Sequence, residues 1–435
     1  MESEKETDMA SQYEQLSTEE LDELIKALEA KADEVRAAGL SLDMARGKPS
    51  VEQTNLSRPM LDILSADSDL TDEGQPADNY GVPYGLPGAR RIAAEILGVP
   101  FDNVLVTGSS SLNLMHDTVV CGYTKGFAGC EPWVKQGEVK FLCPSPGYDR
   151  HFAVTERYGI KNVPVRMLAD GPDMDEVERL VESDASVKGI WCVPKYANPT
   201  GITYSDEVVC RFANLKPAAK DFRIFWDNAY IVHDVTEPKD ELLNIFDVLA
   251  HTGNPDLVFE FASTAKVTFP SSGMAFVASS DANIKELKAA FAIERVSPEK
   301  LTQLMHIRFL KDRQGVLDHM AKQAKILRPR FELVQQKLTD GLGDLGIASW
   351  TSPHGGYFVS FDGPRGSAKA IVGLMKELGV TMTGAGATWP YGKDPLDSNI
   401  RIAPTYPSLE ELSSALDVFV LVVKLVAARL ERQAR

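Results

Sequence analysis

Short apolar runs alternate with helical patterns through the middle of the chain. The runs span residues 104–108, 139–144, 190–194, 222–227, 258–263 and 274–279. Apolar runs of this length between turn residues predict buried strands, and the intervening stretches repeat their apolar positions every three or four residues, which predicts helices. The alternation predicts an α/β fold with a mostly parallel sheet flanked by helices. In such a sheet the residues after each strand line a ligand crevice.

The segments outside this region predict a smaller α+β domain. Ser17-Thr18-Glu19-Glu20 fits a capping box, and a helical pattern runs from there to Gly39. Residues 41–90 are rich in Pro, Gly, Asp and Ser, so we expect an extended crossing loop there. Beyond residue 290 the pattern predicts a long helical region, strands within 348–352, 355–361 and 399–404, a helix at 367–378 and a C-terminal helix.

These elements divide the chain into four expected parts. They are a frayed N-terminus (1–16), an N-terminal helix and crossing segment belonging to the small domain (17–75), a large domain (76–295) and a small C-terminal domain (296–435).

Charge and cysteine content exclude several function classes. Acidic residues outnumber basic ones by 62 to 46, giving a net charge of −16, which argues against a nucleic-acid partner. No apolar run approaches the ~20 residues of a membrane helix, and the acidic N-terminus does not resemble a signal peptide. The five cysteines show no CxxC pair or metal-ligand spacing, so we expect no metal site and a reduced, cytoplasmic setting.

Polar residues at three strand ends suit an aromatic phosphate cofactor held by a lysine. Lys266 follows the run 258–263 and would act as an amine nucleophile, although most lysines are solvated surface charges. Asp227 would pair with a protonated pyridine nitrogen, or would simply cap a helix. Tyr230 would hydrogen-bond the phenolic oxygen of the ring. Asn198, in Asn-Pro-Thr-Gly, would donate to the same oxygen, or belong to a plain turn.

Further candidates would bind a phosphate and a carboxylate. Gly108-Ser109-Ser110-Ser111 precedes a helical pattern and would cradle a phosphate at a helix N-terminus, although such loops are common without a ligand. Arg401 would grip a substrate carboxylate through two hydrogen bonds, or form a structural ion pair. Gly47 would let the backbone approach that carboxylate, or occupy an ordinary turn.

Together these residues resemble the fold type I aminotransferases, which depend on pyridoxal phosphate, from about residue 20 onward. The resemblance rests on their order along the chain, which includes Tyr80 and Tyr148. The strings ARGKPS, SSSLNLM, PGYDRHF, GATWPYGKDP and NIRIAPTYPS are more specific and resemble the subgroup Ic aspartate aminotransferases. The resemblance implies a large domain with a mostly parallel seven-stranded sheet, a smaller α+β domain, and a homodimer that shares its active sites.

The resemblance also implies a role for each residue. Lys266 would hold the cofactor as a Schiff base and move the substrate proton, with Asp227 on the ring nitrogen and Asn198 and Tyr230 on the phenolic oxygen. Tyr148 would stack on the ring, or be a core aromatic residue. Arg401, Gly47 and Asn198 would bind substrate. The phosphate would be held by Ser109, Ser110, Ser111, Ser263 and, from the other subunit, Tyr80.

Two positions depart from the family pattern or leave it open. Many fold type I enzymes have a phosphate-binding arginine eight residues after the lysine, where this chain has Met274, and Ser271 or Ser272 would have to substitute. The distal carboxylate of aspartate would be bound by one of four residues, between which the sequence does not choose: Arg46, Lys48, Lys195 and His354.

The expected reaction is ping-pong transfer of an amino group from L-aspartate to 2-oxoglutarate. Alanine, aromatic or aminoadipate donors are alternatives within the same class. Ser263-x-x-Lys266 also has the form of a serine–lysine pair in penicillin-binding proteins, but the accompanying SDN and KTG elements are missing from the expected context. A cofactor-binding sensor domain without activity is a third alternative, for which residues 1–40 are too short and acidic to form a DNA-binding module.

Overall fold

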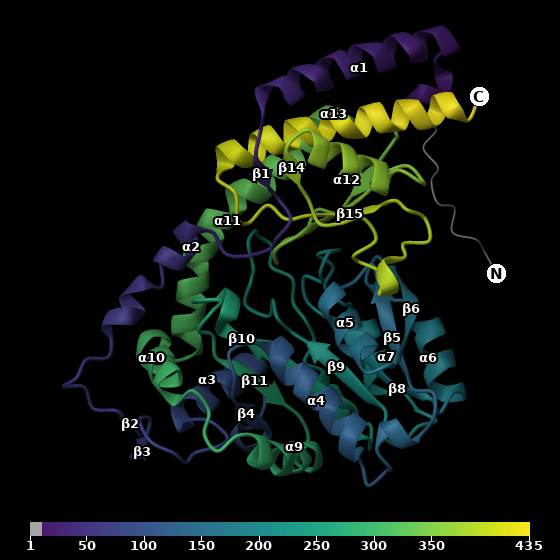
Figure 1. Cartoon of the computed structure of the whole chain (residues 1–435). Coiled ribbons are helices and arrows are strands. Elements are labelled where there is room, and N and C mark those ends of the chain that lie inside the picture. The colour runs from purple at the N-terminus through teal and green to yellow at the C-terminus, as the bar shows by residue number, and fades with distance from the viewer. Residues whose placement is uncertain (1–10) are drawn as a thin grey trace. The chain divides into compact units, whose positions relative to one another are not determined.

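The computed structural model describes residues 11–435, which form two compact units (Figure 1). The sheet unit comprises residues 48–326 and 353–356. The terminal unit comprises 11–47, 327–352 and 357–435. Helix α11 (Arg313–Leu342) contributes residues to both. In the described part of the chain, no helix is long and apolar enough to cross a membrane.

An eight-stranded sheet in the order β4-β11-β10-β9-β8-β5-β6-β7 forms the centre of the sheet unit. Neighbours from β10 to β6 run parallel, whereas β11 is antiparallel to both of its neighbours and β7 to β6. The strands are β4 (Val104–Val106), β5 (Lys140–Ser145), β6 (Lys161–Leu168), β7 (Gly171–Pro172), β8 (Val187–Cys192), β9 (Arg223–Asp227), β10 (Val258–Ser263) and β11 (Ala275–Ala278).

The predicted α/β class is confirmed, but the expected count of seven strands is wrong by one. The additional strand is β7, a two-residue antiparallel strand on the edge of the sheet. It continues directly from the turn after β6 and carries no apolar run of its own, so the hydrophobic pattern gives no signal for it.

Helices cover both faces of the sheet, because alternate residues along a strand face opposite ways. One face packs against α4, α5 and α9, and the other against α6, α7 and α8, with α3 and α10 continuing that layer. These helices are α3 (Pro87–Leu97), α4 (Ser111–Lys125), α5 (Asp149–Arg157), α6 (Met174–Ser183), α7 (Asp206–Ala213), α8 (Ile245–Leu249), α9 (Asp281–Glu294) and α10 (Lys300–Leu310).

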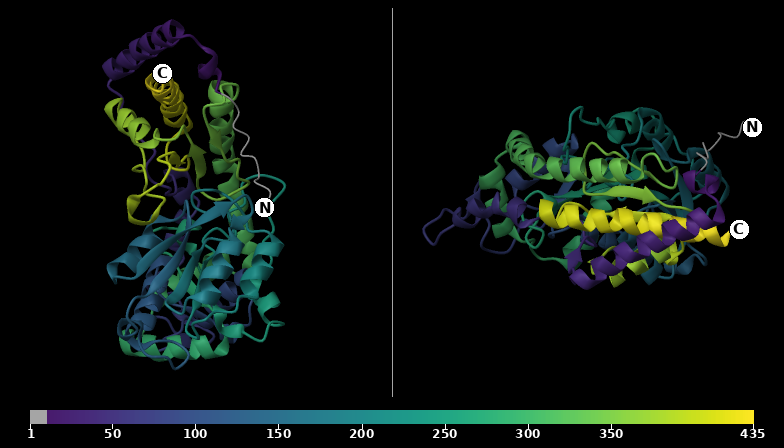
Figure 2. Two further views of the ribbon diagram at one scale, coloured as in Figure 1. Left: turned by 90° about the vertical axis from the view of Figure 1, so that its right-hand side faces the viewer. Right: turned by 90° about the horizontal axis from the view of Figure 1, so that it is seen from above.

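The terminal unit is held together by a pair of long helices. Helix α1 (Thr18–Ala38) begins at the predicted capping box, ends at Gly39 and packs along α13 (Leu409–Gln433), as Figure 2 shows in purple and yellow. The remaining elements are β1 (Leu42–Asp43), which pairs with β14 (Val380–Thr381), the sheet β12 (Ser349–Trp350), β13 (Val359–Asp362) and β15 (Asn399–Ile402), and α12 (Ala368–Glu377).

Two predicted segments differ from the structure. The crossing loop expected at 41–90 contains α2 (Val51–Asn55), the hairpin β2 (Thr71–Asp72) and β3 (Gln75–Pro76), and the start of α3. Of the N-terminus expected to be frayed, residues 1–10 lie outside the described part. In the rest, Gln12–Gln15 forms a turn of 3₁₀ helix with Tyr13 buried, because Arg435 donates hydrogen bonds to its carbonyls.

The two units also divide the chain at other residues than the sequence suggests. Residues 48–75 and 296–326 group with the sheet unit, whereas the sequence placed them in the small domain. The physical reason is burial: Leu304 and Leu310 of α10 belong to the same apolar cluster as Ile92 of α3 and Phe276 of β11.

Candidate active site

Three predicted site residues follow the carboxyl ends of neighbouring parallel strands. Asn198 follows β8, Asp227 ends β9, and Lys266 follows β10 in a short 3₁₀ turn. Ligands of open α/β sheets bind at this edge. The strand ladder therefore fixes these three side chains on adjacent tips of one sheet.

Asp227 is a buried carboxylate with one oxygen satisfied and one not. The residue is 3% exposed, and its Oδ2 lies 2.9 Å from Nε2 of His151. The His151 ring stacks on Trp191, with ring centroids 4.6 Å apart. Oδ1 is buried and has no hydrogen-bond partner among the described residues. No helix begins at Asp227, so the alternative of a helix cap is wrong.

The unpartnered oxygen provides a test of whether a pyridine cofactor fits. A buried carboxylate oxygen is costly unless it accepts a hydrogen bond. The protonated nitrogen of a pyridine ring is a donor of the required kind, so Asp227 suits the cofactor that the sequence implies. His151 was missed by the sequence analysis, because its partner lies 76 residues away.

Lys266 lies against the ring of Tyr230. Its Nζ is 4.6 Å from the ring centroid, and Tyr230 is buried. The charge of Lys266 also acts on two other neighbours. Burial raises the pKa of Tyr148, and the charge of Lys266 opposes that rise. Burial and, in the same direction, the charge of Lys266 lower the pKa of His233 to about 3.

Tyr148 connects the three strand tips. Burial raises its pKa to about 12, and Lys266, Tyr230 and Asp227 are the next largest electrostatic influences on it. Its ring meets His151 edge-on at 4.9 Å between centroids. Tyr148 also lines a cavity of about 20 Å³ together with Asn198, which is 4% exposed. The tips therefore surround one tyrosine.

The loop Gly108-Ser109-Ser110-Ser111 leads into helix α4, as predicted. Gly108 has a left-handed backbone (φ +77°), and α4 starts at Ser111. The loop adjoins the lysine turn at Gly273, where a Cβ would lie 2.5 Å from the Ser109 carbonyl oxygen and 2.9 Å from the backbone of Ala265. One backbone group is already used, since Gly108 N–H donates to Glu299 Oε2 at 3.1 Å.

The other predicted phosphate ligands have different surroundings. Ser263 Oγ accepts a hydrogen bond from the Ala265 N–H at 3.4 Å. Met274 is 1% exposed and belongs to an apolar cluster, so it fills the core where the family pattern has an arginine. Ser271 is exposed and Ser272 half-buried, and no contact of either marks a phosphate site. Tyr80 is 76% exposed.

Arg401 and Gly47 share a stacked arrangement within the terminal unit. The Arg401 guanidinium lies over the ring of Phe358, 4.8 Å from its centroid, and donates to Thr383 Oγ1 at 3.3 Å. A Cβ on Gly47 would lie 2.2 Å from Cζ of the same Phe358 ring. Glycine is therefore required at position 47 for the ring to support Arg401 in this position.

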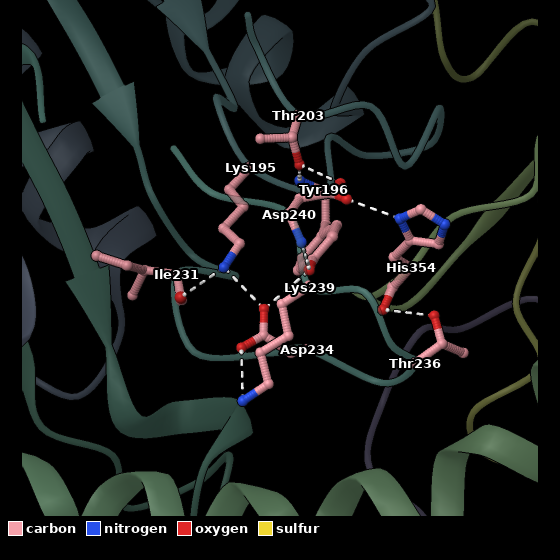
Figure 3. A network of polar contacts seen from close by, with 9 residues as sticks. All are labelled: Lys195, Tyr196, Thr203, Ile231, Asp234, Thr236, Lys239, Asp240 and His354. Atoms are coloured by element: carbon pink, nitrogen blue, oxygen red, sulfur yellow. Dashed lines mark hydrogen bonds and ion pairs between the residues drawn. The ribbon is translucent and has the colours of Figure 1, made fainter. Parts of the chain in front are cut away.

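Two of the four candidates for the distal carboxylate are paired with aspartates. Lys195 Nζ lies 2.7 Å from Asp234 Oδ1, and His354 Nδ1 lies 2.7 Å from Asp240 Oδ1 (Figure 3). Each of these two side chains therefore already has a carboxylate partner within the sheet unit. Of the other two candidates, Arg46 is exposed and Lys48 half-buried.

Comparison with known proteins finds one matching family model. The model of the aspartate amino-transferase family matches residues 16–435. An aspartate aminotransferase from Corynebacterium glutamicum is 41% identical over 402 residues, which cover 92% of this chain and 93% of that protein.

Solved structures agree with this match. The crystal structure of an aspartate transaminase from the same species has a TM-score of 0.93 at 39% identity, and covers 96% of this chain and 99% of that one. An α-aminoadipate aminotransferase from Thermus thermophilus shares the fold, with a TM-score of 0.72 at 19% identity, covering 89% of this chain and 93% of the other.

Proposed function

This chain belongs to the aspartate aminotransferase family, and on that premise we propose that it transfers the amino group of L-aspartate to 2-oxoglutarate with pyridoxal phosphate as cofactor. The observation that carries the proposal is the cluster at the strand tips, in which a lysine amine 4.6 Å from the Tyr230 ring shares the surroundings of Tyr148 with the buried Asp227. Family membership makes the chain an aminotransferase. The donor, the acceptor and the residue roles are the proposal.

Each polar group at the tips has a chemical task in this proposal. When bound, pyridoxal phosphate supplies an electron sink for the substrate Cα. Lys266 Nζ carries the proton to and from Cα. Asp227 keeps a proton on the ring nitrogen and is itself oriented by His151. Asn198 and Tyr230 donate hydrogen bonds to the phenolic oxygen, while Tyr148 provides an aromatic surface for the ring.

The remaining roles concern the phosphate and the substrate. Ser109, Ser110, Ser111 and Ser263 bind the phosphate in this proposal, supported by the contact of Gly273 with both loops. Arg401 binds the substrate α-carboxylate, since its guanidinium is held in a fixed orientation over Phe358. A panel of amino donors, assayed with 2-oxoglutarate, distinguishes aspartate from alanine, aromatic and aminoadipate donors.

Replacement of Lys266 tests the proposal directly. Lys266→Ala should abolish amino transfer and remove the visible absorbance band of a lysine-bound cofactor. Lys288→Ala is a matched control, because Lys288 Nζ lies 5.0 Å from the ring of Tyr84 in a similar arrangement outside the strand tips. Retention of both activity and absorbance in Lys266→Ala would refute the assignment, and so would loss of both in the control.

We also propose a homodimer in which Tyr80 reaches the phosphate of the partner subunit. Supporting this, Tyr80 is 76% exposed and lines a hollow of about 440 Å³ with residues 297–302. Ile293 and Val296, which shortly precede residues 297–302 in the chain, are also exposed apolar side chains. Sedimentation at micromolar concentration should give twice the chain mass of 47.7 kDa. A cytoplasmic setting is consistent with five free cysteines.

A further inference from the structure

A second cavity lies within the sheet unit. We call it the rear cavity. Its volume is about 600 Å³, within the range of small-molecule sites. Its polar lining includes Asn228, Glu260, Lys195, Asp234, Lys239 and Arg313.

The rear cavity is on the other face of the sheet from Asp227. Trp226 and Glu260 line it, whereas Asp227 points with Phe225 to the face that carries His151 and Trp191, because neighbouring residues of a strand face opposite ways. The cavity is therefore separate from the site proposed for the cofactor.

The inner end of the rear cavity is rich in acceptors. Glu260 is 3% exposed and accepts a hydrogen bond from Asn228 Nδ2 at 2.7 Å. No cation of the described chain pairs with it, and burial raises its pKa to about 7. Asn228 is 2% exposed, and its Oδ1 has no hydrogen-bond partner within residues 11–435. Asn228 Oδ1 therefore lacks a donor, and the Glu260 carboxyl has a donor in Asn228 but no cationic partner among the described residues.

The rim of the rear cavity carries charges of both signs, and one of its cations, Arg313, has no ion-pair partner among the described residues. Lys195 and Lys239 both face Asp234, at 2.7 and 3.9 Å, in the network of Figure 3. The exposed guanidinium of Arg313 forms no ion pair with a described residue. A ligand complementary to Glu260, Asn228 and Arg313 therefore carries a donor cation at one end and an anion at the other.

We propose that the rear cavity binds a small amino acid, with its ammonium group between Glu260 and Asn228 Oδ1 and its carboxylate towards Arg313. A protonated amine supplies donors to both buried acceptors, and a charge-assisted hydrogen bond to Glu260 compensates for its burial. This binding is independent of the roles proposed for the cofactor site.

Occupancy of the rear cavity would be transmitted to the reaction through shared backbone. Asn228 directly follows Asp227, and Ile231 directly follows Tyr230. Lys195 donates a hydrogen bond to the Ile231 carbonyl oxygen (3.3 Å) and lies three residues before Asn198 in the chain. The lining of the rear cavity therefore includes residues from all three segments that carry the proposed ring-binding residues.

Binding of β-alanine to the purified holoenzyme tests the proposal. β-Alanine has both charged groups but no amino group α to its carboxylate. Titration calorimetry should detect it, and propylamine and propionate, which carry one group each, should bind at least tenfold more weakly. A crystal of the holoenzyme soaked in β-alanine should show its nitrogen within hydrogen-bond distance of Glu260. Ordered water alone in the cavity, or β-alanine bound only near Lys266, would overturn the proposal.

Two Glu→Gln substitutions test whether the buried Glu260, rather than an acid at the rim, binds the ammonium group. Glu260→Gln should weaken β-alanine binding about tenfold or more, whereas Glu241→Gln, which removes the same charge from the exposed rim of the cavity, should change it less than twofold. Leu242 lines the rear cavity, and Leu242→Trp should block binding because the larger side chain fills the space. This variant provides the test if Glu260→Gln does not fold. Unchanged affinity in a folded Glu260→Gln or Leu242→Trp protein contradicts the site.

Discussion

Replacing His151 by alanine tests how much its hydrogen bond with the buried Asp227 carboxylate contributes to the stability of the fold. His151 and Asp227 have 2% and 4% side-chain exposure and lie 2.9 Å apart. Removing a hydrogen bond to a buried charged group costs about 1.5–3 kcal/mol. Loss of the stacked contact with Trp191 adds about 0.5–1.5 kcal/mol. We therefore expect His151→Ala to lower the free energy of unfolding by about 2–4 kcal/mol.

The measurement is urea-induced unfolding of the purified proteins, followed by tryptophan fluorescence. His116→Ala is the matched control, since His116 also faces an aspartate, Asp117, at 3.1 Å, but with 37% of its side chain exposed. Exposed pairs contribute little, so the control should lose about 1 kcal/mol or less. If His151→Ala proves no more destabilising than His116→Ala, the reasoning from burial fails.

Three further predictions follow from buried groups and close contacts. Burial raises the pKa of Glu260 from its ordinary value of 4.5 to about 7 in the folded protein, so the contribution of this carboxyl to stability falls as pH rises through that window. In unfolding measured from pH 4.5 to 7, the free energy of unfolding of the wild type should fall by about 3 kcal/mol relative to Glu260→Gln. Lys188 Nζ lies 2.7 Å from the buried carboxylate of Asp221, and Lys188→Met removes this cation. The substitution should lower the free energy of unfolding in urea by about 3–5 kcal/mol; a loss below about 1 kcal/mol would contradict this. Gly47→Ala displaces the Phe358 ring and should raise the KM for the amino donor about tenfold with a smaller change in kcat, by steady-state kinetics; an unchanged KM would separate Gly47 from substrate binding.

The sequence predicted the elements whose signals are local. Helix α1 follows its capping box at Ser17 and ends at Gly39, which adopts the left-handed conformation (φ +64°) that glycine favours. The strands β9 and β10 lie within the apolar runs ending at Asp227 and Ser263. Because parallel strand ends meet at one edge, the position of the candidate site followed from these runs alone.

Features that depend on distant partners were not predictable in this way. His151 lies in helix α5, and the local sequence does not indicate that the fold brings Asp227 of strand β9 beside it. Met274 differs from the family pattern, and only its burial shows that the position belongs to the core. One signal was overlooked: Glu260 interrupts the apolar run 258–263, and an acid inside a buried strand indicates a special partner or a cavity.

The pairing of α1 with α13 has a consequence for the order of folding. These helices lie at opposite ends of the sequence and are joined by the ion pairs Arg429–Glu29 and Arg432–Asp22. During translation α1 emerges long before α13, which is its main packing partner, whereas the large sheet needs the chain only to residue 278. Nascent chains halted before residue 409 should therefore contain an ordered sheet and an unprotected first helix, available to chaperones.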